Sequence, residues 1–161
     1  MKAKFIALCV ILGGFSMASG QDLIKAGSLG EFAGSDKFFS GKVKVTMLFK
    51  DAPYMTFGGG LVEFSKGART AWHTHPAGQT LIVTDGTIIT GTENGEVRIA
   101  HKGDTILCPP NVKHWHGATS EQNGAHIALT GVKNGQNVVW LEKLSDSEYN
   151  EAIKKARLNL K

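Results

Sequence analysis

Residues 67–86 read GARTAWHTHPAGQTLIVTDG. His73 and His75 stand two positions apart in this stretch. On an extended strand their side chains point to the same side, about 7 Å apart along the backbone, so both rings can reach one metal ion. Pro76-Ala77-Gly78 predicts a turn that brings Gln79 beside them at the start of the next strand.

A fourth donor, His114, follows the turn-like Pro109-Pro110-Asn111. Three imidazoles and one amide suit a borderline divalent metal, with positions left open for water or substrate. Gln79 has two interpretations: its amide oxygen binds the metal, or it supports the ligands through a hydrogen bond. If it binds, the ligand set is neutral and the metal keeps its full +2 charge, which favours chemistry without a change of oxidation state. Inward histidines also occur as hydrogen-bonded core residues, but three of them, supplied by two separate stretches of the chain, point to a metal.

The chain resembles the cupin superfamily in both of that family's motifs. The first motif runs Gly, five residues, His-x-His, three or four residues, Glu, six residues, Gly. The positions that match in the two motifs are Gly67, His73, His75, Gly86, Gly103, Pro109 and His114. Three positions depart. Gln79 replaces the glutamate of the first motif, and Asn111 and Ala118 replace the glycine and asparagine of the second. The resemblance covers roughly residues 40–150 and implies an all-β jelly-roll barrel with a metal inside.

Within the superfamily, residues 69–76, 78–84 and 114–118 look most like the small bacterial manganese-dependent hydroxynitrile lyases. That resemblance implies an acid/base role for His126 beside the metal, a catalytic place for Thr70, and a substrate pocket at Val62, Phe64 and Thr130. It implies the metal ligands His73, His75, Gln79 and His114. Manganese is the first choice, and iron, nickel, zinc and copper also accept such ligands. A small-molecule substrate and a homo-oligomer are expected.

Three functions remain open at this point. The first is a lyase that reversibly splits a cyanohydrin into a carbonyl compound and cyanide, with His126 taking the hydroxyl proton because imidazole titrates near neutral pH. The second is a metal-dependent dioxygenase of a small organic substrate. The third is a non-catalytic module that binds a metal or small acid, in which His126 would be a buried histidine bonded to a backbone carbonyl.

Short strands separated by turn residues predict a closed sandwich or barrel over residues 41–144. Lys42–Met47 alternates between polar and apolar residues as a half-buried strand does, and Glu93-Asn94-Gly95 is a strong hairpin signal. The glycines 58–60 read as a flexible link before a strand at 61–64. The two strands that carry the predicted ligands come next, one with His73 and His75 and one that begins at Gln79. The other expected strands are 87–92, 96–100, 105–107, 113–116, 126–130 and 138–144. Residues 21–40 read as a loosely held N-terminal arm.

The last segment, residues 145–161, is expected to form one helix. Ser145 and Glu148 fit a capping box at its start. Tyr149, Ile153 and Leu158 are expected to face the sheet.

Residues 1–20 are expected to be a signal peptide, because two lysines precede the apolar run 5–15 and small residues follow at 18–20. The run is shorter than the roughly 20 residues that span a bilayer, which argues against a membrane anchor. A periplasmic or extracellular location follows. The formal net charge is +4, and loss of Lys2 and Lys4 would leave about +2, so no nucleic-acid or membrane-surface patch is implied.

Four further residues have open roles. Cys108 is expected to be a small buried side chain rather than a reactive thiol. His116 either supports the site or is structural. Arg69 either pairs with Glu63 or another acid, or contacts substrate. The two tryptophans next to the histidines, Trp72 and Trp115, point away from the ligands by alternation and are expected to pack in the core or at an interface.

Overall fold

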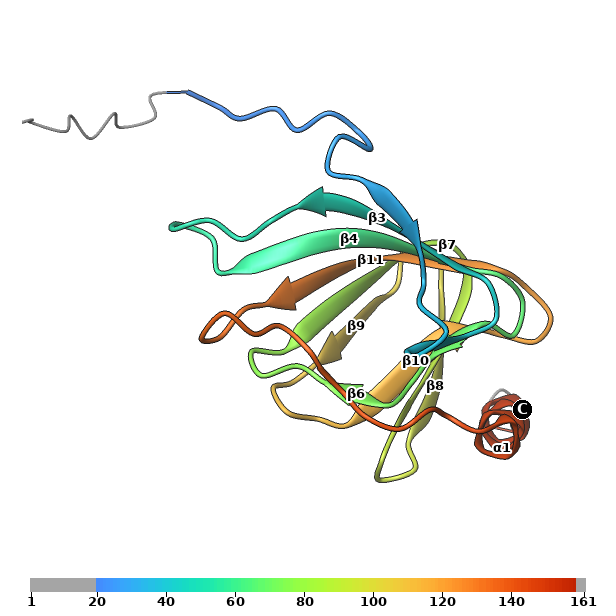
Figure 1. The fold of residues 1–161 in the computed structure, drawn as a ribbon. Helices are drawn as coiled ribbons and strands as arrows, with labels where there is room; N and C mark the ends of the chain where they lie inside the picture. The colour runs from blue at the N-terminus through green and yellow to red at the C-terminus, as the bar shows by residue number, and fades with distance from the viewer. Residues whose placement is uncertain (1–19, 159–161) are drawn as a thin grey trace, which may run out of the picture.

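The computed structural model describes residues 20–158, so the predicted signal peptide lies almost wholly outside the described residues. Most of the described chain is strand, and a single helix follows at the end (Figure 1). The elements are β1 Glu31–Ala33, β2 Phe39–Ser40, β3 Val43–Phe49, β4 Phe57–Phe64, β5 Arg69–Thr70, β6 His73–Thr74, β7 Gln79–Thr92, β8 Val97–His101, β9 Thr105–Cys108, β10 His114–Ala118, β11 Gly124–Gly131, β12 Val139–Trp140 and α1 Asp146–Leu158. The predicted all-β barrel with one C-terminal helix is confirmed.

The strands form two curled layers that share β7. The first half of β7 pairs with β11 and β9, in a layer that continues through β4 and β3 to β1. Its second half pairs with β8 and β10, and β10 leads on to β5 and β6. The two layers face each other, and α1 lies at one end beside β8 (Figure 1).

A single glycine allows β7 to serve both layers. Gly86 has φ +58°, and a Cβ built there would lie 2.0 Å from the carbonyl oxygen of Asn123. Only glycine fits such a close approach at positive φ. The sequence predicted one strand that begins at Gln79 and a separate strand at 87–92, but the bend at Gly86 redirects one continuous strand instead of ending it.

The glycines 58–60 lie inside β4, so the prediction of a flexible link there was wrong. The Phe49 ring packs directly against the backbone of Gly59, where an added Cβ would lie 2.3 Å from Phe49 Cε1. Gly58 and Gly60 line the barrel interior and leave space there. Within the segment expected as an arm, β1 pairs with β3 and β2 pairs with β5.

Two apolar clusters fill the molecule. The first lies between the layers and includes Val43, Phe64 and Val83. The second joins Trp115 to Tyr149 and Ile153 of α1, as expected for a tryptophan that points away from the ligands. Leu158, the last residue of α1, is 69% exposed, so the expectation that it faces the sheet was wrong.

The capping box at the start of α1 is confirmed. The Glu148 amide donates to Ser145 Oγ at 3.2 Å, and the Ser145 amide donates to the Glu148 carboxylate at 2.8 Å. Arg69 pairs with Asp146 at 2.5 Å, whereas Glu63 pairs with Lys44 at 2.7 Å. Arg69 therefore ties β5 to the helix. Within residues 20–158, no helix is long and apolar enough to cross a membrane.

Candidate metal centre and proton-transfer site

Three histidines are held through Nδ1 by backbone carbonyls. His73 Nδ1 lies 2.9 Å from the Ala71 oxygen, and His75 Nδ1 lies 2.6 Å from the Asn137 oxygen. His114 Nδ1 lies 2.8 Å from the Val112 oxygen. A carbonyl only accepts, so Nδ1 carries the hydrogen in each ring and Nε2 keeps its lone pair. Metal-binding histidines are typically oriented in this way.

The three rings lie close together although they come from different parts of the chain. His73 and His114 are register partners on β6 and β10, and their ring centroids are 4.2 Å apart. His75 lies 5.0 Å from His73 and 5.4 Å from His114 by the same measure. The β6–β10 pairing thus joins the two motifs.

Gln79 begins β7 beside this cluster. Its Nε2 donates to Thr130 Oγ1 at 3.0 Å, which leaves Oε1 as the free atom. Among the described residues, Gln79 Oε1, His75 Nε2 and His114 Nε2 are buried polar atoms without a hydrogen-bond partner. Buried polar atoms are rarely left unpaired, so these acceptors fit a cation. The rings of His73, His75 and His114 lie in one cluster, and Gln79 lines a cavity together with His73 and His75.

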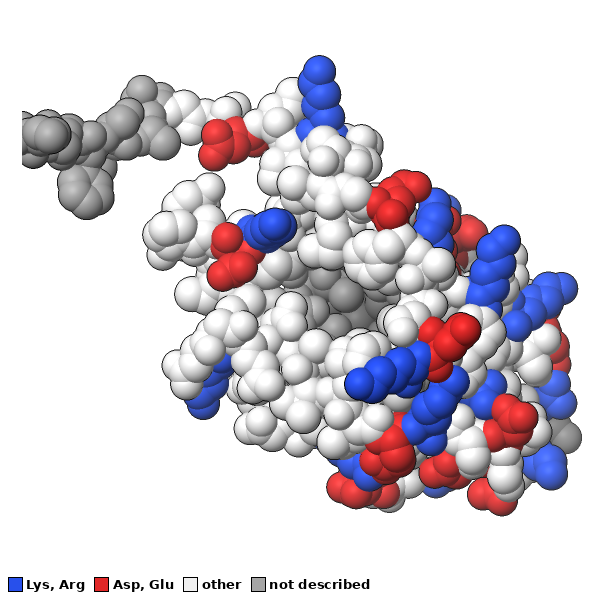
Figure 2. All heavy atoms as spheres, in the orientation of Figure 1, with Lys and Arg blue, Asp and Glu red and all other residues white. Residues whose placement is uncertain are grey.

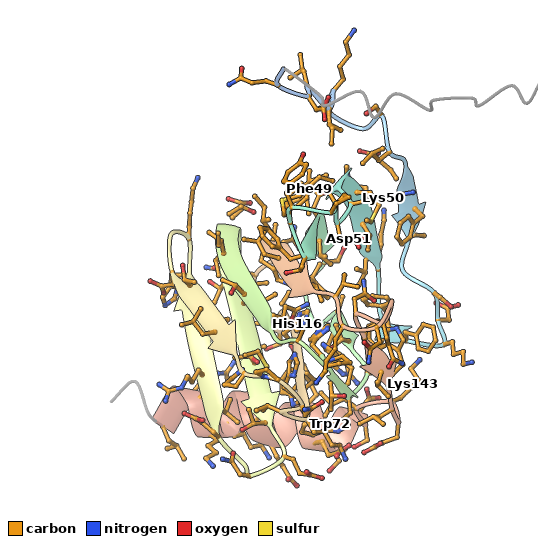
Figure 3. The ribbon with its side chains drawn as sticks, turned by 90° about the vertical axis from the view of Figure 1, so that its left-hand side faces the viewer. Phe49, Lys50, Asp51, Trp72, His116 and Lys143 are labelled. Carbon is orange, nitrogen blue, oxygen red and sulfur yellow. The ribbon has the colours of Figure 1, made fainter. Side chains whose placement is uncertain are left out.

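His116 lies closer to this cluster than the sequence indicated. One donor atom each from His73, His114 and His116 lies within 4.8 Å of the others, an arrangement that could hold a metal ion. Figure 3 shows His116 in the barrel interior, with Trp72 toward α1. Because His116 is two residues beyond His114 on β10, the His-x-His spacing of residues 114–116 is the signal that could have drawn attention to it.

A second pair of histidines lies next to the cluster. His126 Nε2 is 3.1 Å from His116 Nδ1, so His126 bonds another imidazole. His126 is completely buried, and Phe64 packs against both rings, with centroids 5.6 Å from His126 and 5.9 Å from His116. Phe64, expected in the substrate pocket, instead lies behind the two rings in the core. Thr70 Oγ1 accepts the His116 amide at 3.1 Å.

Burial keeps these histidines neutral. It lowers the pKa of His114 to about 4 and that of His126 to about 3. It also lowers the pKa of His73, His75 and His116, and neighbouring histidines lower those of His73 and His116 further. Neutral imidazole is the form that binds a metal or accepts a proton. Burial raises the pKa of Cys108 to about 11, so this buried thiol is protonated, as expected for an inert side chain.

Metal-free protein is expected to lose stability as the pH falls below 6.5. The unfolded chain binds protons on these histidines near pH 6.5, whereas the folded chain resists them until about pH 4 at His114 and about pH 3 at His126. The unfolded state therefore holds more protons in that window, and each histidine lowers the free energy of unfolding by up to about 1.4 kcal/mol per pH unit. Urea unfolding with chelator from pH 7.5 to 4.5 measures this effect.

The exposed His101 provides the matched control for this series. Its variant His101→Gln is expected to follow the wild-type profile. A urea midpoint that stays constant between pH 7.5 and 5 would contradict neutral burial of the cluster.

His73, His75, His116 and His126 border a cavity of about 240 Å³ inside the barrel. Figure 2 shows a hollow between the two layers, with most charged side chains gathered elsewhere, toward the helix end. Val62, Thr70 and Thr130, predicted site residues, line this cavity. Its lining also includes Phe39, Asn137 and Trp140, which the sequence did not single out.

Known proteins resemble this chain in sequence and in fold. A family model described as Cupin domain matches residues 60–130. An (R)-mandelonitrile lyase from Granulicella tundricola is 39% identical over 129 residues, which cover 80% of this chain and 98% of that protein. A cupin-like protein from Thermotoga maritima is 38% identical with a TM-score of 0.71, and the match covers 82% of this chain and 97% of that one. A cupin-2 domain protein from Rhodospirillum rubrum, 12% identical with a TM-score of 0.59 over 83% of this chain and 84% of that one, shares the fold alone.

Proposed function

This chain belongs to the cupin family, and we propose that it is a metal-dependent lyase that reversibly splits a cyanohydrin into a carbonyl compound and cyanide. The observation that carries the proposal is the cavity, which His126 and the predicted metal ligands His73, His75 and Gln79 line together. A barrel packed solid around the histidines would have favoured a non-catalytic module. The relative named as a lyase supports the same reaction class.

In this proposal a divalent metal, with manganese the expected one, would be held by His73, His75, Gln79 and His114. When bound there, the metal supplies a positive charge that stabilises the negative charge developing during bond cleavage. The donor set is neutral, which favours a metal that keeps its +2 state and disfavours oxidation of substrate by oxygen.

His126 takes the proton of the substrate hydroxyl. The electron pair of the O–H bond then forms the carbonyl, the bond to the nitrile carbon breaks, and cyanide leaves with the electron pair of that broken carbon–carbon bond. Burial lowers the pKa of His126 to about 3, below the near-neutral value expected from the sequence, so its lone pair is free but the ring is a weak base. The negative charge of the leaving group offsets the cost of forming a buried imidazolium. The His116 ring at 3.1 Å holds His126 in orientation. In the reverse direction His126 returns the proton to the new hydroxyl.

Release of benzaldehyde from mandelonitrile tests the proposal. Protein reconstituted with manganese is expected to release benzaldehyde well above the buffer blank, followed by absorbance. A rate equal to the blank would exclude the lyase. Oxygen consumption by iron-loaded protein with small organic substrates would instead support the dioxygenase.

We further propose that the chain is exported and forms a homo-oligomer. The leader-like pattern of residues 1–20 supports export. Exposed apolar side chains in the N-terminal segment, Leu23 at 86% and Phe32 at 52%, support self-association. N-terminal sequencing of exported protein and light scattering of the purified protein test these two points. An unprocessed N-terminus would refute export, and a monomer mass would refute the oligomer.

A further inference from the structure

We propose that Trp140 selects the substrate, and that with Phe39 it forms a wall against which an uncharged, flat apolar group, such as an aryl ring, lies. The inference rests on the proposed function, because it names the group attached to the reacting carbon. Both residues line the cavity that the histidines also line. From the sequence, Trp140 was expected only to lie in a strand at 138–144.

The Trp140 ring is fixed by contacts on three sides. It stacks on Phe38 with ring centroids 4.8 Å apart and planes 17° from parallel. It meets Phe39 edge-on at 5.6 Å and His73 at 4.9 Å. Its backbone is the register partner of His73 on β6. A ring fixed in this way keeps its orientation when a ligand binds, so binding carries no free-energy cost for ordering the Trp140 side chain.

The same short segment also holds the histidine cluster. Asn137, three residues before Trp140, accepts from His75 Nδ1 at 2.6 Å, while Trp140 packs on His73. A ligand that lies on the Trp140 ring is therefore next to the predicted metal ligands. This places its apolar group on the wall and its polar reacting atoms toward the histidines.

The cavity lining determines the class of ligand. Within residues 20–158, none of the residues that line the cavity is a lysine, arginine, aspartate or glutamate. A charged substituent buried there would lose its hydration without gaining a partner. Apart from the histidines, the lining is largely apolar, with Val45, Met47 and Val62 in addition to the two aromatic residues. A neutral molecule with one flat apolar end and one polar end fits this lining.

Binding to metal-free protein tests the wall independently of activity. The probes are benzyl alcohol, cyclohexylmethanol with a ring of similar size that is not flat, and benzoate with the same aryl ring but a charge. Benzyl alcohol is expected to bind, and benzoate is expected to bind at least tenfold more weakly. In Trp140→Leu the dissociation constant for benzyl alcohol should rise about 5–10-fold through loss of the aromatic face, and that for cyclohexylmethanol less than twofold. Calorimetric titration measures all three.

Two variants keep the test interpretable. Trp140→Phe retains an aromatic face and is expected to bind benzyl alcohol within about threefold of wild type. Leu141→Ala alters the next residue, which is 38% exposed and does not line the cavity, and should leave all three affinities unchanged. Equal weakening of both alcohols in Trp140→Leu, or no weakening of either, would overturn the proposal.

The activity of manganese-loaded protein separates this proposal from the lyase. If the binding pattern holds but mandelonitrile is not cleaved, the role of Trp140 is supported and the lyase proposal is refuted. If mandelonitrile is cleaved and Trp140→Leu lowers kcat/KM equally for mandelonitrile and acetone cyanohydrin, the lyase stands and Trp140 does not select the substrate. A loss of bound metal in Trp140→Leu at unchanged benzyl alcohol affinity would assign Trp140 to positioning His73 alone.

Discussion

Replacement of His114 by alanine is expected to remove the bound metal. His114 brings the second motif to the first, and its Nε2 is buried without a partner while Nδ1 is tied to the Val112 carbonyl. Even a change in a residue that only orients a ligand typically weakens metal binding 10–100-fold, so loss of a ligand should weaken it at least about 100-fold. Manganese per chain after dialysis against limiting free metal, measured by elemental analysis, is expected to fall from about one to near zero.

His101→Ala is the matched control, since it removes an exposed imidazole on β8. It should retain the wild-type metal content. Circular dichroism must show that His114→Ala is folded, because the ring is buried next to His73. A folded His114→Ala protein that keeps its manganese would mean that the metal site lies elsewhere, and the lyase mechanism would lose its charge stabiliser.

The parts of the site that follow from local geometry could be predicted from the sequence. The alternation of a strand places His73 and His75 on one side, and the turn at 76–78 returns Gln79 to them. The cluster of His73, His75 and His114 in the structure agrees with this reasoning. The hairpin at residues 93–95 was likewise predictable, because Gly95 takes φ +83° in the turn.

The parts that depend on which distant segments meet could not be predicted. Whether Asn137 and Trp140 reach the His73–His75 strand is decided by the β6–β12 pairing, and no local pattern encodes that pairing. Asp146 was not identified as the partner of Arg69, because the partner depends on where α1 docks. Gly86 was misread for a different reason: a positive φ ends many strands, and only the close approach of Asn123 shows that here it bends one.

The second large effect is expected at His126. Removing a general base typically costs 10²–10⁴-fold in rate, so His126→Ala should lower kcat for mandelonitrile cleavage by about that factor. The loss should appear in kcat more than in KM, because the proton is transferred only as the bond breaks. Stopped-flow or steady-state absorbance of benzaldehyde measures it.

Metal content separates a proton-transfer role for His126 from a structural one. His126 contacts His116 at 3.1 Å but is not among the four predicted ligands, so His126→Ala should keep its manganese while losing its rate. His126→Gln keeps a polar side chain in the same place but has no lone-pair nitrogen to accept the proton, and it should be equally slow. A manganese-loaded, folded His126→Gln protein within about tenfold of wild-type kcat would show that His126 is not the base. The hydroxyl proton would then have to reach another group on the cavity wall.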